Sequence, residues 1–178
     1  MRNYFEFFGL PVSFQIDEEE LKRRYYANSR RFHPDFHTRA DADLQAEMLE
    51  MASLNNEAWR ALSNPESRTR HLLQLHGLMR DESQTPPMSP DFLMEVMEIN
   101  ETLMDLQMEP DADKAAQARQ SIENLRSQLE NEARNLQARW SGPDDLETLK
   151  KIEEIFYKKR YLLRIDENLR TFAAHSNE

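Results

Sequence analysis

Three side chains that could bind a metal, move a proton or make charged hydrogen bonds lie within five residues of one another. His33, Asp35 and His37 alternate along the chain, and Pro34 separates the first two. Imidazole nitrogens and carboxylate oxygens are ligands for zinc or iron. The same residues are also compatible with a polar segment at the negative end of a helix, followed by a loop. The residue types alone therefore leave a metal site and a structural loop open.

The rest of the sequence gives little support for catalysis. It contains no cysteine, which excludes disulfides, thiolate catalysis, cysteine-ligated zinc and cysteine-held Fe–S clusters within this chain. It has no glycine-rich phosphate loop, nucleophile elbow or dinucleotide fingerprint. We therefore expect no enzyme, no catalytic residue, no resident metal and no cofactor. A metal-dependent enzyme is the alternative, and it predicts stoichiometric metal and sensitivity to chelators.

Charge and hydropathy narrow the class of partner. The 178 residues carry a net charge of −10, with −2 in residues 1–76 and −8 in residues 77–178. An acidic chain argues against nucleic acid as the main partner, because phosphate binding needs a basic surface. No apolar run approaches the roughly 18 to 20 residues that span a bilayer. The first residues resemble neither a signal peptide nor a transit peptide. We expect a cytoplasmic protein, bacterial more than mitochondrial, with no nucleic-acid or membrane partner.

Apolar spacing predicts an all-α fold. The chain has only three glycines and no useful alternating apolar run. A short aromatic helix is expected at residues 4–8. A second helix is expected from a cap at Asp17 to Phe32, where Pro34 ends it. A third should follow at residues 42–63, and its predicted inward residues are Leu44, Met48, Met51, Asn55, Ala58 and Leu62.

The helix before the loop carries a cluster of cations that lie off its inward stripe. They are Lys22, Arg23, Arg24, Arg30 and Arg31. The plain interpretation is a solvated helix face. The alternative is a docking surface for an acidic partner, since such clusters raise association rates.

The second half of the chain is predicted to be a separate domain. Residues 77–89 are polar and proline-rich, as in a linker. Three helices follow in residues 90–178, and their short connections favour an antiparallel three-helix bundle over a dimeric coiled coil. Glu132 interrupts the heptad of the middle helix. The expected core residues of the last helix are Leu149, Ile152, Phe156 and Leu163.

Residues 3–76 resemble a J domain. The resemblance rests on Tyr4-Phe5 with Gly9-Leu10, the basic helix, the His33-Pro34-Asp35 loop and the return helix with Ala58-Trp59-Arg60-Ala61-Leu62. It implies a helical hairpin that presents this loop to an HscA/DnaK-class heat-shock chaperone and stimulates the chaperone's ATPase. Asp35 and His33 would then make hydrogen bonds to the chaperone, Pro34 would hold the loop, and the five cations would dock on an acidic face.

The chain as a whole is similar to the HscB family, the J-type co-chaperones of iron–sulfur cluster assembly. Matching stretches are Gly9-Leu10-Pro11, Leu72-Leu73 with Leu75-His76-Gly77, and Phe92-Leu93-Met94-Glu95. The resemblance implies that the C-terminal bundle binds an IscU-type Fe–S scaffold protein and delivers it to the chaperone. With no cysteine, this chain would handle the scaffold and not the iron.

The resemblance also implies a scaffold-binding patch, which falls on Leu93, Met94, Met97, Glu98, Glu101 and Phe156. Surplus apolar residues in the helix that begins near residue 90 agree with an exposed partner site. Leu93 and Met97 could instead be bundle core. Two alternatives for the whole chain stay open: a J-domain co-chaperone for a different client, and a helical adaptor in which the tripeptide is accidental.

Overall fold

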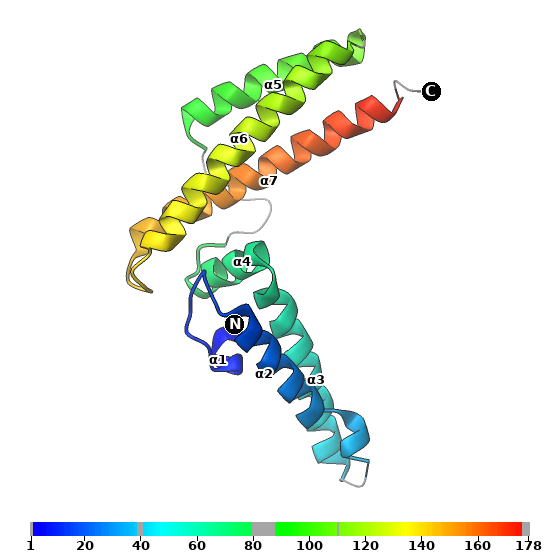
Figure 1. Cartoon of the computed structure of the whole chain (residues 1–178), viewed down its shortest axis with the longest axis vertical. Helices are drawn as coiled ribbons and strands as arrows, with labels where there is room; N and C mark the ends of the chain where they lie inside the picture. The colour runs from blue at the N-terminus through cyan, green and yellow to red at the C-terminus, as the bar shows by residue number, and fades with distance from the viewer. Residues whose placement is uncertain (1, 39–40, 80–87, 110, 176–178) are drawn as a thin grey trace. The chain divides into compact units, whose positions relative to one another are not determined.

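The structure is a computed structural model that describes residues 2–38, 41–79, 88–109 and 111–175. All regular structure in these residues is helical (Figure 1), which confirms the predicted all-α class. The elements are α1 (Tyr4–Phe8), α2 (Glu18–Arg31), the 3-10 turn η1 (Pro34–Phe36), α3 (Ala42–Ser63), α4 (Pro65–Leu75), α5 (Pro90–Met108), α6 (Ala112–Arg139) and α7 (Leu146–His175). No helix among the described residues is long and apolar enough to cross a membrane.

The chain divides into two compact units. The first contains residues 1–79 with residues 142–144, and the second contains residues 80–141 and 145–178. Residues 80–87, most of the predicted linker, lie outside the described residues. The linker therefore stays a prediction, and each unit is described by itself.

The first unit is built on a hairpin of α2 and α3, which lie side by side (Figure 1). The Asp17 carboxylate begins α2 by accepting a hydrogen bond from the backbone N–H of Glu20 at 3.0 Å, as the sequence predicts. Leu21 and Phe32 are buried on α2 and at its C-cap, and Leu62 is fully buried on α3. Apolar burial at helical spacing thus joins the two helices.

A polar and aromatic contact marks the middle of the hairpin. The Asn55 side-chain amide, only 1% exposed, donates to the carbonyl of Tyr25 at 3.1 Å and to the Ser29 hydroxyl at 3.0 Å. The Tyr25 ring packs against Trp59 with ring centroids 4.7 Å apart. A buried amide with bonded partners fixes how two helices meet, because sliding would leave polar groups unsatisfied.

The predicted inward stripe of α3 is wrong at its first member. Leu44 is 39% exposed, whereas Asn55, Ala58 and Leu62 are buried as expected. The reason is local, since the short turn η1 contacts α3 and offers no full apolar helix face.

Helix α1 supplies aromatic core to this unit. Phe5 and Phe8 are buried, so the prediction of a core helix is confirmed. The N–H of Tyr4 donates to Nε2 of His71 on α4 at 3.1 Å, and the two rings stack with centroids 4.4 Å apart. Gly9 ends the helix with φ +62, a left-handed conformation that favours glycine.

Arg24 fastens the end of α1 to α2. Its Nη1 donates to the backbone carbonyls of Phe8 and Gly9, with 2.7 Å to Gly9, and its Nε donates to Glu20 at 2.6 Å. These contacts satisfy carbonyls that a helix end otherwise leaves without partners. A Cβ on Gly9 would lie 2.7 Å from the Arg24 Nη1, so a larger residue here would have to displace the end of the Arg24 side chain.

The second unit is a bundle of α5, α6 and α7, in which each helix contacts the other two. This confirms the predicted three-helix bundle, and Figure 1 shows α6 and α7 running alongside each other. The core is apolar and includes Phe92, Val96, Ile99, Leu103, Leu106, Ala118, Ile122, Leu125, Leu129, Ala133, Ile155, Leu162, Ile165 and Leu169.

One detail of the bundle agrees with the sequence prediction and one differs from it. The heptad spacing of α6 is interrupted at Glu132 as predicted, because Glu132 is exposed and the buried residue is Ala133, four positions after Leu129 instead of three. On α7, Leu163 is 53% exposed, whereas its neighbour Leu162 is 2% exposed. The bundle-facing stripe runs through Ile155 and Leu162 at a spacing of one heptad, which turns Leu163 outward.

Replacing Arg24 by Ala should destabilise the first unit by about 2 kcal/mol, because charged hydrogen bonds to two helix-end carbonyls are lost. Arg23→Ala is the matched control: Arg23 pairs with the same Glu20 but is 73% exposed, so the expected change is within about 0.5 kcal/mol. Urea unfolding followed by Trp59 fluorescence, in a Trp140→Phe background, measures both. Equal effects of the two substitutions would show that the α1 contacts contribute nothing.

His71 should make the first unit sensitive to acid. Burial lowers the pKa of His71 to about 4, below its ordinary value of 6.5. Its Nε2 can accept from the Tyr4 N–H only while that nitrogen is unprotonated. Between pH 6.5 and 4 the unfolded chain therefore binds more protons at this residue, and stability falls as pH drops, by up to about 3 kcal/mol.

Thermal unfolding monitored by Trp59 fluorescence across pH 4 to 7, in the same Trp140→Phe background, checks this expectation. His71→Phe keeps a ring against Tyr4 but cannot titrate, so its stability should depend less on pH in this window even if it is lower at pH 7. An unchanged pH slope in this variant would assign the acid sensitivity to other groups.

Candidate functional site

The His33-Pro34-Asp35 loop forms one compact turn. The His33 backbone is extended, with φ −67 and ψ 128, the region favoured before proline. Its Nδ1 accepts from the Asp35 N–H at 3.2 Å, and its carbonyl accepts from the Phe36 N–H at 3.1 Å. The tripeptide thus has a defined shape that its own hydrogen bonds maintain.

Both flanking helices hold this turn. The His37 Nε2 donates to the carbonyl of Arg31, in the last turn of α2, at 2.8 Å. The Gln45 side-chain amide on α3 donates to the carbonyl of His37 at 3.3 Å. The His37 side chain therefore stabilises the loop itself. In the part of the chain that the structure describes, no group of three or more His, Cys, Asp or Glu side chains could hold a metal ion.

The other two polar side chains of the loop face solvent. The His33 side chain is 51% exposed and that of Asp35 is 84% exposed, with 3.7 Å between the His33 Nδ1 and the nearer Asp35 oxygen. A carboxylate and an imidazole held in this way can make charged hydrogen bonds to a second protein.

Phe36 is a candidate contact that the sequence analysis missed. Its side chain is 73% exposed, and its ring meets His33 edge to face with centroids 5.8 Å apart. A large aromatic residue directly after Asp35, in a predicted loop, was the signal available in the sequence. Aromatic side chains, Phe among them, are enriched at protein–protein interfaces.

The predicted cations divide into two sets. Four are exposed on α2, namely Lys22, Arg23, Arg30 and Arg31. The exception is Arg24, which is partly buried and donates to the carbonyls of Phe8 and Gly9 at the end of α1. Hydrogen bonds from Arg23 and Arg24 hold the pKa of Glu20 below its ordinary value.

Helix α5 exposes a row of apolar side chains on the face away from the bundle core. The exposed fractions are Leu93 44%, Met94 64%, Met97 60%, Met104 67% and Met108 88%. The interpretation of Leu93 and Met97 as bundle core is therefore wrong. Met104 and Met108 extend the row beyond the predicted patch. We call these five residues the α5 outer face.

The charges of α5 all have one sign. Between its first and last residues the helix has no Lys or Arg, and its acids are Asp91, Glu95, Glu98, Glu101 and Asp105. Glu101 lies within the same arc of the helix as Met94 and Met108, so acids are interspersed with the exposed apolar side chains, which suits a partner surface that combines apolar residues with cations.

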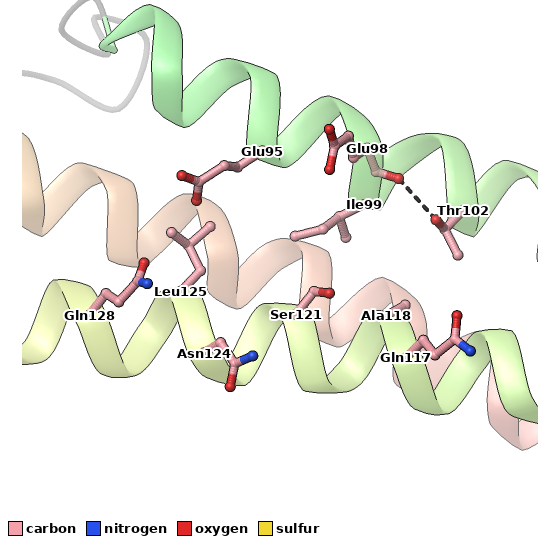
Figure 2. Close-up of a pocket in the computed structure, with 10 residues that line it drawn as sticks. All are labelled: Glu95, Glu98, Ile99, Thr102, Gln117, Ala118, Ser121, Asn124, Leu125 and Gln128. Carbon is pink, nitrogen blue, oxygen red and sulfur yellow. Dashed lines mark hydrogen bonds between the residues drawn. The ribbon is translucent and has the colours of Figure 1, made fainter.

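A groove lies between α5 and α6, on another side of α5 (Figure 2). Glu95, Glu98 and Thr102 line it from α5, and Gln117 and Asn124 are among the polar residues that line it from α6. The Thr102 hydroxyl donates to the backbone carbonyl of Glu98 at 3.0 Å. Glu98 therefore lies toward this groove and not within the row of methionines.

Phe156 does not share the exposure of the α5 outer face. It lies on α7 and is 6% exposed. Phe156 is therefore the one residue of the predicted patch whose side chain is buried.

Comparisons with known proteins agree with this architecture. Residues 88–170 match the family model described as the HSCB C-terminal oligomerisation domain. The chain is 37% identical to a co-chaperone protein HscB homolog of Neisseria meningitidis over 76% of this chain and 78% of that protein. It is 30% identical to the homolog of Haemophilus ducreyi over 93% and 95% of the two chains.

Solved structures show the same fold. Human co-chaperone protein HscB is 26% identical with a TM-score of 0.70, over 96% of this chain and 82% of that one. Chaperone HscB from Vibrio cholerae is 25% identical with a TM-score of 0.60, over 98% and 99%. Taken with the loop between α2 and α3 and the acidic three-helix bundle, these matches show that the chain belongs to the HscB family of co-chaperones.

Proposed function

We propose that this protein stimulates ATP hydrolysis by an HscA/DnaK-class heat-shock chaperone and delivers an IscU-type Fe–S scaffold protein to it. The observation that carries the proposal is the ordered turn that holds His33 and Asp35 toward solvent. The protein would itself be no enzyme and would act in the cytoplasm, as the sequence predicts.

The chaperone would dock on the loop and on the exposed cations of α2. Asp35 would accept charge-assisted hydrogen bonds, and His33 would complete the contact without transferring a proton. Lys22 and Arg30 would speed the encounter with an acidic chaperone surface. The order of the loop supports this role, because a turn already held in shape loses little conformational entropy on binding.

The scaffold would dock on the α5 outer face. Its exposed methionines and leucine supply adaptable apolar area, and the acids of α5 would select a basic rim on the scaffold. Because this chain has no cysteine, the cluster would stay on the scaffold's own ligands. The two surfaces lie in different units of the chain, so each can be tested alone.

His33→Gln should abolish stimulation of the chaperone's ATPase while the fold is retained, because the exposed imidazole carries the contact. His37→Gln is the matched control in the same loop, since a Gln amide can still donate to the carbonyl of Arg31. Single-turnover ATP hydrolysis measures both, and circular dichroism checks folding. Full stimulation by a folded His33→Gln variant would exclude the loop as the contact.

Substituting Leu93, Met94 and Met97 together by Ser should weaken scaffold binding by about 2 kcal/mol or more, roughly 30-fold, because apolar contacts at an interface centre are lost. Leu163→Ser is the matched control, because Leu163 on α7 is 53% exposed, more than Leu93 at 44%. Titration calorimetry measures the affinity. Stimulation of the chaperone without scaffold should not change, and loss of both activities would indicate unfolding instead.

One experiment tests the two halves together. Single-turnover ATP hydrolysis by the chaperone is measured with this protein alone, with the scaffold alone, and with both. A synergistic rise with both supports the whole proposal. Stimulation that is the same with and without the scaffold would support the chaperone contact and point to a different client. No stimulation at all would leave a helical adaptor.

A further inference from the structure

The most exposed methionines of the described chain gather on α5. Met94, Met97, Met104 and Met108 are 60% to 88% exposed. The four other described methionines are only partly exposed, and they are Met48, Met51, Met79 and Met88. The sequence has nine methionines and no cysteine, so thioethers are its only sulfur groups.

The four exposed methionines form one stripe. Their spacings of three, seven and four residues place them within an arc of about 80° on a helix that turns 100° per residue. The stripe is about 21 Å long at 1.5 Å per residue. It lies on the side of α5 away from Val96 and Leu103, which are buried in the bundle. We call it the methionine stripe.

Thioethers at such exposure react with peroxides. The sulfur lone pair attacks one oxygen of hydrogen peroxide, an S–O bond forms, the O–O bond breaks, and water leaves. Sulfur is oxidised by two electrons to the sulfoxide and the peroxide is reduced by two. The product is polar and chiral, which disrupts methionine-rich interfaces, and methionine sulfoxide reductases reverse it.

We propose that the methionine stripe is a reversible oxidation site that turns off docking of the scaffold. The binding part rests on the proposed function, whereas the selectivity of oxidation does not. Sulfoxides at Met94 and Met97 would place polar groups in the middle of the apolar contact, where desolvation without hydrogen bonds is unfavourable. Met104 and Met108 would lengthen the contact and add two further sites of oxidation.

The first arm of the test needs no partner. The full-length protein is treated with hydrogen peroxide, and the sulfoxide at each methionine is followed by mass spectrometry. The four stripe residues should oxidise several-fold faster than Met51 and Met88. Equal rates at all described methionines would overturn the proposed site.

The second arm measures docking. Affinity for the scaffold should fall at least ten-fold when the stripe is oxidised, and treatment with methionine sulfoxide reductases should restore it. A variant with all four residues changed to Leu should lose the sensitivity to peroxide, so that its own affinity for the scaffold is the same before and after treatment. Unchanged affinity of the fully oxidised wild type would overturn the inference.

Two controls separate the possible failures. Oxidised protein should still stimulate the chaperone without scaffold, because the loop around His33 contains no methionine. Loss of that stimulation would attribute the effect to unfolding and count against a local switch. If the untreated protein fails to bind the scaffold, the proposed function fails, while the first arm still decides whether the oxidation site exists.

Discussion

The packing of α2 against α3 is the contact on which the functional loop depends. Asn55 hydrogen-bonds across the hairpin to Tyr25 and Ser29, and this arrangement fixes how far the two helices can slide. The loop joins the adjacent ends of α2 and α3, so its shape depends on how the packing places those two ends. His37 and Gln45 then connect it to the last turn of α2 and the first turns of α3. The groups offered to solvent are thereby positioned by partly buried hydrogen bonds within the hairpin and by exposed hydrogen bonds between the loop and both helices.

The sequence predicts those features of the fold that have local causes. Asp17 caps the helix that follows it, and Pro34 ends the helical segment before it, and both effects need only neighbouring residues. Features that depend on distant packing were missed. Leu162 and Leu163 are equivalent in the sequence, and only the register of α7 in the bundle buries one and exposes the other. Arg24 bonds a carbonyl 15 residues away, which no helical pattern reveals.

The candidate binding surfaces likewise combine features with local causes, which the sequence predicts, and features that depend on tertiary packing, which it does not. The sequence indicates that α5 has more apolar residues than one core stripe needs, but only tertiary packing decides which of them face outward. The exposed loop was identified through a tripeptide and its two flanking helices, and Phe36 was overlooked because a single aromatic in a loop has no periodic pattern. Phe156 was assigned to an exposed patch by resemblance, but its side chain is buried. A match in residue type therefore does not predict how exposed a side chain is.

The docking of α1 has a consequence for protein synthesis. Its first N–H bonds to His71, a residue 67 positions later in the chain. At about 5 to 20 residues per second, α1 leaves the ribosome several seconds before its partner is made. Phe5 and Phe8 are buried only when the first unit closes, so until His71 is available they form an exposed aromatic segment. Transient exposure of such apolar surface is the condition under which nascent chains aggregate or need chaperones.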